Sequence, residues 1–500
     1  MNSLGFARLA VCIPPVRVAN PRANADAILR SLRDAAEAKA DVALFPELSL
    51  SGYTCGDLFL SSTLLDAVGA EFDRLRREAA DVFSGVAIVG MPLELPAEGL
   101  FNVAALFQNG RALGFVPKTH LPNYREFYEL RHFRSGADLH GAWHLDAPVA
   151  PGLCFRTPDD PRFGLGVEIC EDLWAPQPPS GAMALAGATL LCNLSASNEL
   201  VGKADYRRSL VLGQSARCMA AYAYAGSGVT ESTQDLVFGG HGLVAENGVL
   251  LGETKRFVRT GQLLVVDVDL ERLTHDRRLI NTYHPPGGLA PDSETLDSVR
   301  LTDHDFKTLR RSVPAHPFVP ADPATLAERC EEVFQIQSAG LAKRIESARI
   351  GSLQLGVSGG LDSTLALLVA VRACDLLGMS RTEIRGVTMP GFGTSSRTLA
   401  NARKLMEHLG VSAAEIDIRA QCLETFRALG HQPFGIDLAG LSVEQLQERL
   451  QALPPENRED LVFENVQARI RTLVLMSRGF VVGTGDLSEL ALGWCTYGVG

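Results

Sequence analysis

The first half of the chain alternates short, continuous apolar runs with stretches in which apolar residues recur at helical spacing. The runs at 6–14, 41–47 and 85–95 predict buried strands, and the stretches at 21–40 and 59–81 predict amphipathic helices. This alternation of strands and helices is typical of an α/β domain.

Two hairpins interrupt this alternation. Asn-Gly pairs at 109–110 and 247–248 supply the positive φ that a tight turn needs. Between them, apolar runs predict strands at 164–170 and 188–197, and a long helix is expected from 203 to about 225. Because hairpins and helical crossovers both occur, the pattern predicts a mixed sheet.

The pattern changes between Ile280 and Ala321, where proline, glycine and serine are frequent and no periodicity is sustained. We predict a linker at 281–324 that follows the protein surface. It separates a first domain at 1–280 from a second domain at 325–500.

The second domain opens with an amphipathic helix at 325–347 and then alternates strands with helices. Strands are expected at SLQLGV, RGVTMP, EIDI and GFVVGT, and helices at TLALLVAVRACDLLG, RTLANARKLMEHLG and ENVQARIRTLVLM. This order predicts a doubly wound parallel sheet, whose ligands bind beyond the carboxyl ends of its strands. The chain stops at Gly500, soon after such a strand end, so we expect the coding sequence to continue beyond it.

The composition is that of an ordinary globular protein, because 46% of the 500 residues are hydrophobic and 21% are charged. The net charge of −11 disfavours a nucleic-acid-coating or membrane-binding protein. The ten cysteines contain no C-x-x-C pair, and neither a signal peptide nor a long apolar run is visible. We therefore expect a cytoplasmic protein whose partners are small molecules.

Three chemically distinct side chains each follow an apolar strand: Glu47 after VALFP, Lys118 after LGFVP and Cys170 after GLGVEI. Strand ends can converge on one rim of a sheet. There the glutamate could take the thiol proton and the lysine could stabilise an oxyanion. Taken singly, each residue is better explained as packing or as a solvated charge, because buried cysteines are usually structural. The three together favour an active site.

The segments around these residues, FPELSLSGY, PKTHLPNYREFYE and VEICEDLW, resemble the nitrilase (carbon–nitrogen hydrolase) superfamily over most of residues 5–270. The resemblance implies an αββα sandwich and amide hydrolysis through a cysteinyl acyl-enzyme. It also implies an auxiliary glutamate, either Glu129 or Glu126. Both of these could instead be solvated residues of a helix face.

Resemblance to glutaminase members of the superfamily implies a set of residues that line a glutamine pocket: Tyr53, Phe127, Glu171, Ser197 and Lys203. A glutamate next to the nucleophile suits the α-ammonium group of glutamine. Tyr53 and Phe127 could equally be core aromatics, and Lys203 could be a lysine that only begins a helix.

A glycine-containing turn, SGGLDS at 358–363, stands between a predicted strand and a predicted helix. Its glycines let backbone N–H groups approach a phosphate, and the helix N-terminus adds positive potential. The string resembles the PP-motif of ATP pyrophosphatases, and an ordinary capped Gly-Gly turn is the alternative. No Walker A string occurs, and GHGLVA at 240–245 lacks the following helix that a dinucleotide site needs.

Two further segments of the second half carry charged residues that suit nucleotides. ENVQARIR places Arg469 and Arg471 near a helix start, where they suit either phosphates or a solvated helix face. GTGDLSEL follows a strand with Thr484, Asp486 and Glu489. The two carboxylates suit Mg²⁺, and their spacing also fits a helix cap.

As a whole, residues 5–500 resemble the family of glutamine-dependent NAD⁺ synthetases, in which a glutaminase supplies ammonia for the ATP-dependent amidation of deamido-NAD⁺. The resemblance implies that Asp362 and Glu489 bind Mg²⁺, that Arg469 and Glu489 contact deamido-NAD⁺, and that the chain forms a homo-oligomer. The residues that it assigns to ATP are Gly356, Val357, Ser358, Gly359, Gly360, Leu361, Asp362, Ser363 and Thr484.

Two departures accompany this resemblance. The stretch between ENVQARIRTLVLM and GFVVGTGD is shorter than in the family, and the family's C-terminal part, with further basic substrate contacts, is absent. Two other functions stay open on the sequence alone: a different glutamine-fed adenylating amidotransferase, and a nucleotide-binding scaffold with inert sites. The preferred acceptor distinguishes the first, and ATP binding without glutamate production would identify the second.

Overall fold

The structure is a computed structural model that describes residues 5–139, 141–231, 236–283, 295–301, 308–454 and 459–493. The chain divides into two compact units, Met1–Val313 and Pro314–Gly500, and each is described by itself. The parts of the predicted linker at 284–294 and 302–307 lie outside the described residues. Within the described part of the chain, no helix combines the length and the apolar character needed to cross a membrane.

The first unit contains two sheets. The strands of the first sheet are β1 (Phe6–Ile13), β2 (Val42–Leu44), β3 (Val86–Leu95), β4 (Gly99–Gln108), β5 (Arg111–Pro117), β6 (Ala142–His144), β7 (Ala147–Val149) and β14 (Gln262–Asp269). They lie in the order β14-β1-β2-β3-β4-β5-β7-β6. The strands of the second sheet are β8 (Cys154–Arg156), β9 (Gly164–Ile169), β10 (Leu190–Ser195), β11 (Ala221–Gly226), β12 (Gly242–Glu246), β13 (Val249–Glu253) and β15 (Thr295–Asp297). Their order is β13-β12-β11-β10-β9-β8-β15, and both sheets mix parallel with antiparallel pairs.

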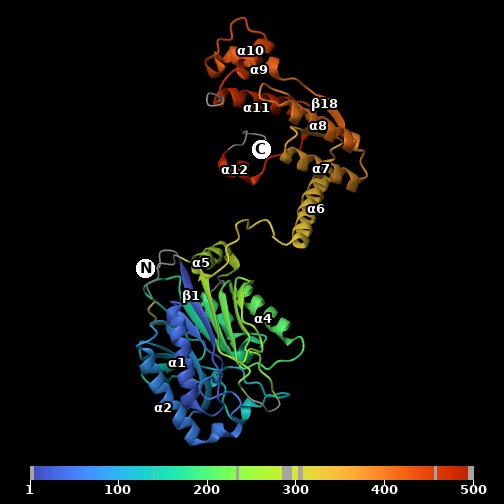
Figure 1. Cartoon of the computed structure of the whole chain (residues 1–500). Coiled ribbons are helices and arrows are strands. Elements are labelled where there is room, and N and C mark those ends of the chain that lie inside the picture. The colour runs from blue at the N-terminus through green and yellow to red at the C-terminus, as the bar shows by residue number, and fades with distance from the viewer. Residues whose placement is uncertain are drawn as a thin grey trace. The chain divides into compact units, whose positions relative to one another are not determined.

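Helices cover both outer faces of this pair of sheets. They are α1 (Pro21–Glu37), α2 (Ser62–Ala79), α3 (Pro179–Leu185) and α4 (Lys203–Cys218). The helix α5 (Leu270–Leu279) instead contributes Leu270 and Leu273 to the apolar layer between the sheets. Figure 1 shows α1 and α2 on one side of the strands and α4 on the other. The arrangement is the αββα sandwich that the sequence predicts, within a mixed α/β fold.

The apolar core of the first unit lies in three layers, which explains why its strands are apolar on both faces. Side chains of both sheets meet in the middle layer, for example Val11 with Leu194. Ile28 of α1 and Phe72 of α2 pack on the outer face of the first sheet. Met183 of α3 packs on the outer face of the second. Strand alternation places side chains of β9, β10 and β11 alternately in the middle layer and under α3 and α4.

The helix predicted from 203 to about 225 is wrong in its second part. The helix α4 ends at Cys218, because Met219 adopts a left-handed φ of 42°, and the next residues form β11. The run AYAYAG is a short apolar segment that length alone does not distinguish from the end of a helix. The strands and turns predicted at the two Asn-Gly pairs are confirmed by the β4–β5 and β12–β13 hairpins.

The second unit contains a four-stranded parallel sheet with helices on both faces. Its strands are β16 (Leu353–Gly356), β17 (Ile384–Thr388), β18 (Ser412–Glu415) and β19 (Phe480–Val481), in the order β18-β17-β16-β19. Its helices are α6 (Pro323–Ala348), α7 (Leu361–Leu377), α8 (Ser396–Leu409), α9 (Arg419–Leu429), α10 (Val443–Gln451), α11 (Leu461–Met476) and α12 (Leu487–Leu492). One apolar cluster joins the sheet to α6, α7 and α8, and another joins it to α9, α10 and α11.

This second sheet is doubly wound, as the sequence predicts. The order runs outward from β16 to β18 and then returns to the other side of β16 with β19, so the winding reverses between β16 and β19. Ligands of such sheets bind where the winding reverses, beyond the carboxyl ends of the strands. The strand predicted at EIDI lies three residues earlier, at Ser412–Glu415, and EIDI is mostly the connection that follows it.

Candidate active sites

In the first unit, the ends of two strands bring a lysine between two carboxylates. Glu47 follows β2 and Lys118 follows β5, each directly after a proline. The Lys118 Nζ lies 2.6 Å from Glu47 Oε1 and 2.7 Å from Glu129 Oε1, and the lysine side chain is completely buried. Of the two glutamates considered for an auxiliary role, Glu129 is therefore the one that contacts Lys118. Glu126 instead accepts a hydrogen bond from Asn198.

Further hydrogen bonds fix both carboxylates. Glu47 accepts from Asn102 Nδ2 at 2.7 Å and from the Ala196 N–H at 2.8 Å. Glu129 accepts from the Tyr53 hydroxyl at 2.8 Å. Burial raises the pKa of Glu129 to about 7 although Lys118 opposes this shift. Burial also disfavours the charge of Lys118, but the two carboxylates outweigh it and raise its pKa well above the usual value.

Cys170 begins a short 3-10 helix, η4 (Cys170–Leu173), directly after β9, in a strained turn. Its φ of 45° lies in the left-handed region, which a side chain with a Cβ rarely adopts. The Asn193 side chain accepts the Cys170 N–H at 3.2 Å. The buried Asp172 carboxylate accepts the N–H groups of Ile169 at 3.0 Å and of His120 at 2.7 Å. Asp172 thus ties the turn of Cys170 to the loop that follows Lys118.

The Cys170 thiol faces this charged group and is almost inaccessible to solvent. Only 6% of the residue is exposed. Burial, together with the charge of Glu47, raises the pKa of the thiol to about 12, although Lys118 opposes this shift. The structure therefore brings the three predicted catalytic residues into one electrostatic environment. In it, a cysteine can become a thiolate only if a neighbouring group accepts its proton.

The residues predicted to bind glutamine surround this centre on different elements. Tyr53 and Phe127 line a small cavity together with Glu129. The Lys203 Nζ lies 5.6 Å from the centre of the Phe127 ring. The Glu171 carboxylate accepts from the Tyr124 hydroxyl at 2.9 Å.

Ser197 and Lys203 each form a hydrogen bond with a neighbouring polar residue. The Ser197 Oγ accepts from Arg207 Nη2 at 3.3 Å, and Lys203 Nζ donates to Asn198 Oδ1 at 2.6 Å. Burial lowers the pKa of Lys203, while the neighbouring Cys170 opposes this shift. Lys203 therefore lies near enough to Cys170 for the two charges to interact.

The sequence reasoning missed several polar residues of this site. Asn102 is a lone polar residue in the apolar run FNVAALF. A single polar residue in a buried strand indicates a buried hydrogen-bond partner, which here is Glu47. Ser195 donates a hydrogen bond to the Cys170 Sγ at 3.1 Å, and Tyr224 donates to Ser195. Tyr224 was hidden because its strand, β11, was predicted as the end of a helix.

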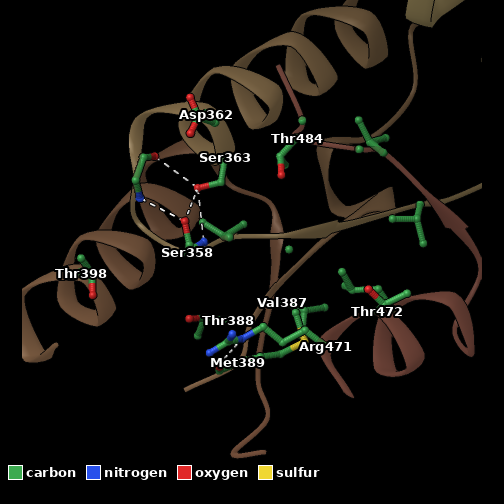
Figure 2. A pocket seen from close by; sticks show the side chains of 18 of the residues that line it. Ser358, Asp362, Ser363, Val387, Thr388, Met389, Thr398, Arg471, Thr472 and Thr484 are labelled. Carbon is green, nitrogen blue, oxygen red and sulfur yellow. Dashed lines mark hydrogen bonds between the residues drawn. The ribbon is translucent and has the colours of Figure 1, made fainter. Parts of the chain in front are cut away.

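In the second unit, a cavity of about 540 Å³ opens beyond the carboxyl ends of β16, β17 and β19. It lies where the winding of the sheet reverses, which is the position predicted for a ligand. Figure 2 shows Ser358, Ser363 and Asp362 on one side of the cavity and Arg471 with Met389 on another.

The predicted phosphate-binding turn is closed by its own hydrogen bonds. Ser363 Oγ accepts from the Ser358 N–H at 3.2 Å and lies 3.0 Å from Ser358 Oγ. The Gly360 N–H donates to Ser358 Oγ at 3.2 Å. Gly359 has a φ of 84°, and a Cβ added there would lie 2.1 Å from the Thr398 carbonyl oxygen. Only glycine fits this position.

Most residues that were predicted to bind ATP line the cavity: Gly356, Val357, Ser358, Gly360, Asp362, Ser363 and Thr484. Gly359 and Leu361 are not part of the lining, and Leu361 is 86% exposed. Of the two arginines on α11, Arg471 lines the cavity and donates to the Met389 carbonyl at 3.3 Å. Arg469 is exposed and does not line it.

Two carboxylates suited to a divalent cation face the same cavity. Asp362 and Glu489 both belong to its lining. Asp486 caps α12, and the Glu489 carboxylate accepts the Asp486 N–H at 3.2 Å, so the helix-cap interpretation also holds. Across the described ranges, no group of three or more His, Cys, Asp or Glu side chains is placed to hold a metal by itself. Two carboxylates beside a phosphate-binding turn do fit Mg²⁺, which binds through one or two carboxylates together with substrate phosphates.

Comparison with known proteins gives one family for each half of the chain. The family model for carbon-nitrogen hydrolases matches residues 8–278, and that for NAD synthases matches residues 333–500. The chain is 41% identical over 512 residues to the glutamine-dependent NAD(+) synthetase of Mycobacterium leprae, a match that covers all of this chain and 72% of that protein. It is 28% identical to the enzyme of that name from Thermotoga maritima, covering 95% of this chain and 73% of that protein.

A solved structure is similar over almost the whole chain. It is the glutamine-dependent NAD⁺ synthetase from Acinetobacter baumannii in complex with ADP, with 22% identity and a TM-score of 0.47. The match covers 98% of this chain and 77% of that one.

Proposed function

The chain belongs to the glutamine-dependent NAD⁺ synthetase family, and from this premise we propose how its two units divide one reaction. The first unit hydrolyses glutamine to glutamate and ammonia. The second unit uses ATP to activate deamido-NAD⁺, and ammonia then converts the activated group to the amide of NAD⁺. AMP and pyrophosphate are the other products.

In the first unit, Cys170 is the nucleophile and Glu47 is the general base. Glu47 accepts the thiol proton, and the thiolate attacks the carbon of the glutamine side-chain amide. Lys118 and the backbone N–H after Cys170 stabilise the oxyanion of the tetrahedral intermediate. The intermediate collapses as Glu47 returns the proton to the leaving nitrogen, which departs as ammonia and leaves a thioester on Cys170.

Glu47 then acts a second time. It removes a proton from water, the resulting hydroxide attacks the thioester, and the proton returns to the sulfur as glutamate leaves. The buried contacts of Glu47 with Asn102, Lys118 and the Ala196 N–H keep its carboxylate in one position through both steps. Tyr53, Phe127, Glu171, Ser197 and Lys203 are proposed to line the glutamine pocket.

In the second unit, the carboxylate of deamido-NAD⁺ attacks the α-phosphorus of ATP, and pyrophosphate leaves. Ammonia then attacks the carbonyl carbon of the mixed anhydride, loses a proton and displaces AMP. The turn at 358–363 and Thr484 are proposed to bind the phosphates, and Arg469 and Glu489 to contact deamido-NAD⁺. Asp362 and Glu489 would hold Mg²⁺, and the bound ion would neutralise negative charge on the phosphates.

Further features are proposed from the chemistry and from the family. Ammonia in bulk water is mostly ammonium, which has no lone pair for attack, so we propose that it reaches the second unit through a passage sealed from solvent. We also propose a homo-oligomer that acts in the cytoplasm on these small molecules.

One observation supports this division of labour above all others. A single chain carries a buried cysteine beside a Glu47–Lys118–Glu129 cluster in one unit and a glycine turn at a reversal of the parallel sheet in the other. The first set suits cleavage of an amide, and the second suits cleavage of ATP. Neither alone makes an amide from glutamine.

The substitution Cys170→Ala tests the proposal. We expect it to abolish glutamate release and glutamine-driven NAD⁺ formation, while NAD⁺ formation with an ammonium salt continues. The matched control is Cys192→Ala, which removes a buried thiol of β10 from the middle layer and should retain both activities. Loss of synthesis with both nitrogen sources in a folded Cys170→Ala protein would contradict the proposal.

The acceptor is tested separately. We expect AMP release to depend on deamido-NAD⁺ and not on xanthosine monophosphate or aspartate. A preference for either of these would identify a different adenylating amidotransferase. ATP binding without any glutamate or AMP production would identify an inert scaffold.

A further inference from the structure

The sulfur of Cys170 contacts a hydroxyl group that is not part of the Glu47–Lys118–Glu129 cluster. The Ser195 Oγ donates to the Cys170 Sγ at 3.1 Å, and the Tyr224 hydroxyl donates to the Ser195 Oγ. Ser195 and Tyr224 are both fully buried. The sulfur is therefore the end point of a hydrogen-bond chain that approaches it from the second sheet.

The backbone fixes the positions of these side chains. In the parallel pair of β9 and β10, Ile169 lies opposite Leu194, so the next residues of the two strands, Cys170 and Ser195, are neighbours. Tyr224 comes from β11, the strand on the other side of β10. Because the strands are bonded to one another, the chain of hydroxyls is rigid before any substrate arrives.

A buried cation lies over the ring of Tyr224. The guanidinium carbon of Arg207 is 5.9 Å from the centre of the Tyr224 ring, and Arg207 Nη2 donates to Ser197 Oγ at 3.3 Å. Arg207 belongs to α4 and is 1% exposed. Read from Tyr224 to the sulfur, each hydroxyl donates its proton toward Cys170, and such aligned hydrogen bonds strengthen one another.

We propose that Ser195 is a further catalytic residue, which stabilises the Cys170 thiolate by a hydrogen bond, and that Tyr224 and Arg207 are positioning residues that polarise it. The inference rests on the proposed role of Cys170 as the nucleophile. It adds a second source of thiolate stabilisation to Lys118.

The electrostatics of the site explain why a second source is needed. Lys118 carries one positive charge but contacts two carboxylates, Glu47 and Glu129, so the cluster has a net charge of −1 when both are ionised. A thiolate beside it is disfavoured by that charge and by burial. A neutral hydroxyl donor can stabilise the thiolate by a hydrogen bond, and unlike Lys118 it carries no charge that the two carboxylates neutralise.

All charged and titratable groups that act on the thiol have to be considered when its ionisation is measured. They are Glu47, Lys118, Glu129, Tyr53, Tyr124, Lys203, Arg207 and Tyr224. Substitutions at Ser195 leave every one of these groups in place. They therefore isolate the contribution of the hydroxyl.

The test measures the ionisation of the thiol directly, without glutamine. The rate of alkylation of Cys170 by iodoacetamide is followed against pH by mass spectrometry in the unmodified protein, Ser195→Ala and Tyr224→Phe. We expect Ser195→Ala to lower the rate about tenfold at each pH below the pKa of the thiol, because a hydrogen bond to a charged group is lost. Tyr224→Phe should lower it about threefold, because Ser195 still donates but is no longer polarised.

Two controls separate this effect from general damage. Tyr222→Phe removes another buried hydroxyl from the same face of β11, where it donates to Glu168, and should leave the alkylation profile unchanged. Cys330 is exposed and is alkylated in the same samples, so its profile reports the reagent and should be the same in all variants.

The outcomes distinguish this inference from the proposed function. Unchanged Cys170 profiles in Ser195→Ala and Tyr224→Phe, or equal effects of Tyr224→Phe and Tyr222→Phe, would overturn the hydrogen-bond chain. A Cys170 that is not alkylated in any variant would overturn both the chain and the nucleophile. The expected profiles in a protein that releases no glutamate from glutamine would support the chain and contradict the proposed glutaminase.

Discussion

The two units place the charges of their sites in opposite environments. In the first unit, Glu47, Lys118 and Glu129 are buried and contact one another. In the second unit, Asp362 is exposed and Glu489 is half-buried, and both line a cavity. The first site holds its own counter-charges, whereas the second presents a turn and carboxylates to a ligand that carries phosphates.

The pKa values of the acids show the same contrast. In the first unit, burial raises the pKa of Glu129, Glu168, Asp172 and Glu231, whereas hydrogen bonds from arginines lower the pKa of Asp57 and of Glu253. Among the described acids of the second unit, every resolved shift is a lowering, caused mainly by hydrogen bonds at the surface. These acids are Asp322, Glu346, Asp375, Asp417, Glu444 and Asp460.

The difference follows from the chemistry that each site is proposed to perform. Cleavage of an amide by a thiol develops charge that the protein alone has to stabilise, so its charges are buried and positioned in advance. Adenylation develops charge on phosphates, which bring their own negative charge and Mg²⁺. Changes to the charges of the first site should therefore affect the stability of the first unit, whereas changes to the second site should affect the binding of its ligand.

The largest expected effect is that of removing the charge of Lys118. Lys118→Met leaves Glu47 and Glu129 buried without a cation, so we expect the free energy of unfolding of the first unit to fall by about 3–5 kcal/mol. The measurement is the denaturant midpoint of first-unit peptides, followed by hydrogen exchange and mass spectrometry. Glutamate release should be lost as well.

The matched control for this change is Lys343→Met in the second unit. Lys343 lies 2.7 Å from Glu346, as close as Lys118 lies to Glu129, but both side chains are exposed. We expect no resolvable change in the stability of the second unit, because exposed ion pairs are screened by water. Equal losses in the two variants would break the contrast between the units.

The next effect concerns pH. Glu168 is buried and accepts hydrogen bonds from the Tyr222 hydroxyl and from the Ser180 N–H, the latter at 2.7 Å. Burial raises its pKa from 4.5 to about 7, so between these values the folded unit holds a proton that the unfolded chain has released. The stability of the first unit should therefore fall as pH rises through this window, by up to about 3 kcal/mol from this group.

Glu168→Gln measures this contribution, because glutamine keeps the shape and does not ionise. We expect the difference in unfolding free energy between the original protein and the variant to change with pH between about 4.5 and 7 and to be constant above it. The denaturant midpoint of first-unit peptides at a series of pH values gives that difference. A difference that does not vary with pH would show that Glu168 is ionised in the folded unit.

The sequence predicted the fold of both units because their strands and helices follow clear hydrophobic periods. It failed at β11, where AYAYAG continues the apolar character of α4 and only the left-handed Met219 separates them. It also gave no indication of α9 and α10, which were not among the predicted helices.

The candidate sites were predictable where a residue type and a strand end coincide. Glu47, Lys118 and Cys170 were found in this way, as was the turn at 358–363. Ser195 and Tyr224 were not, because their role depends on which strands are neighbours, and strand order is not readable from hydrophobic pattern. The choice between Glu129 and Glu126 also required the contact with Lys118.

The smallest expected effect tests strain, which both sites contain for different reasons. Cys170, the proposed nucleophile, has a left-handed φ of 45° although it carries a side chain, whereas Gly359, with a φ of 84°, has no Cβ to clash with its surroundings. Gly359→Ala would place a Cβ 2.1 Å from the Thr398 carbonyl, so the turn must shift and its cost is about 1–3 kcal/mol. We expect ATP affinity, measured by calorimetric titration, to fall about tenfold or more, with the denaturant midpoint of the first unit unchanged.

Gly360→Ala is the matched control, because its φ is −86° and its Cβ would meet only Ser358 Oγ at 3.3 Å. If both variants bind ATP equally well, the conformation of the turn at 358–363 is not needed for nucleotide binding. The proposed difference between the two sites would then be contradicted.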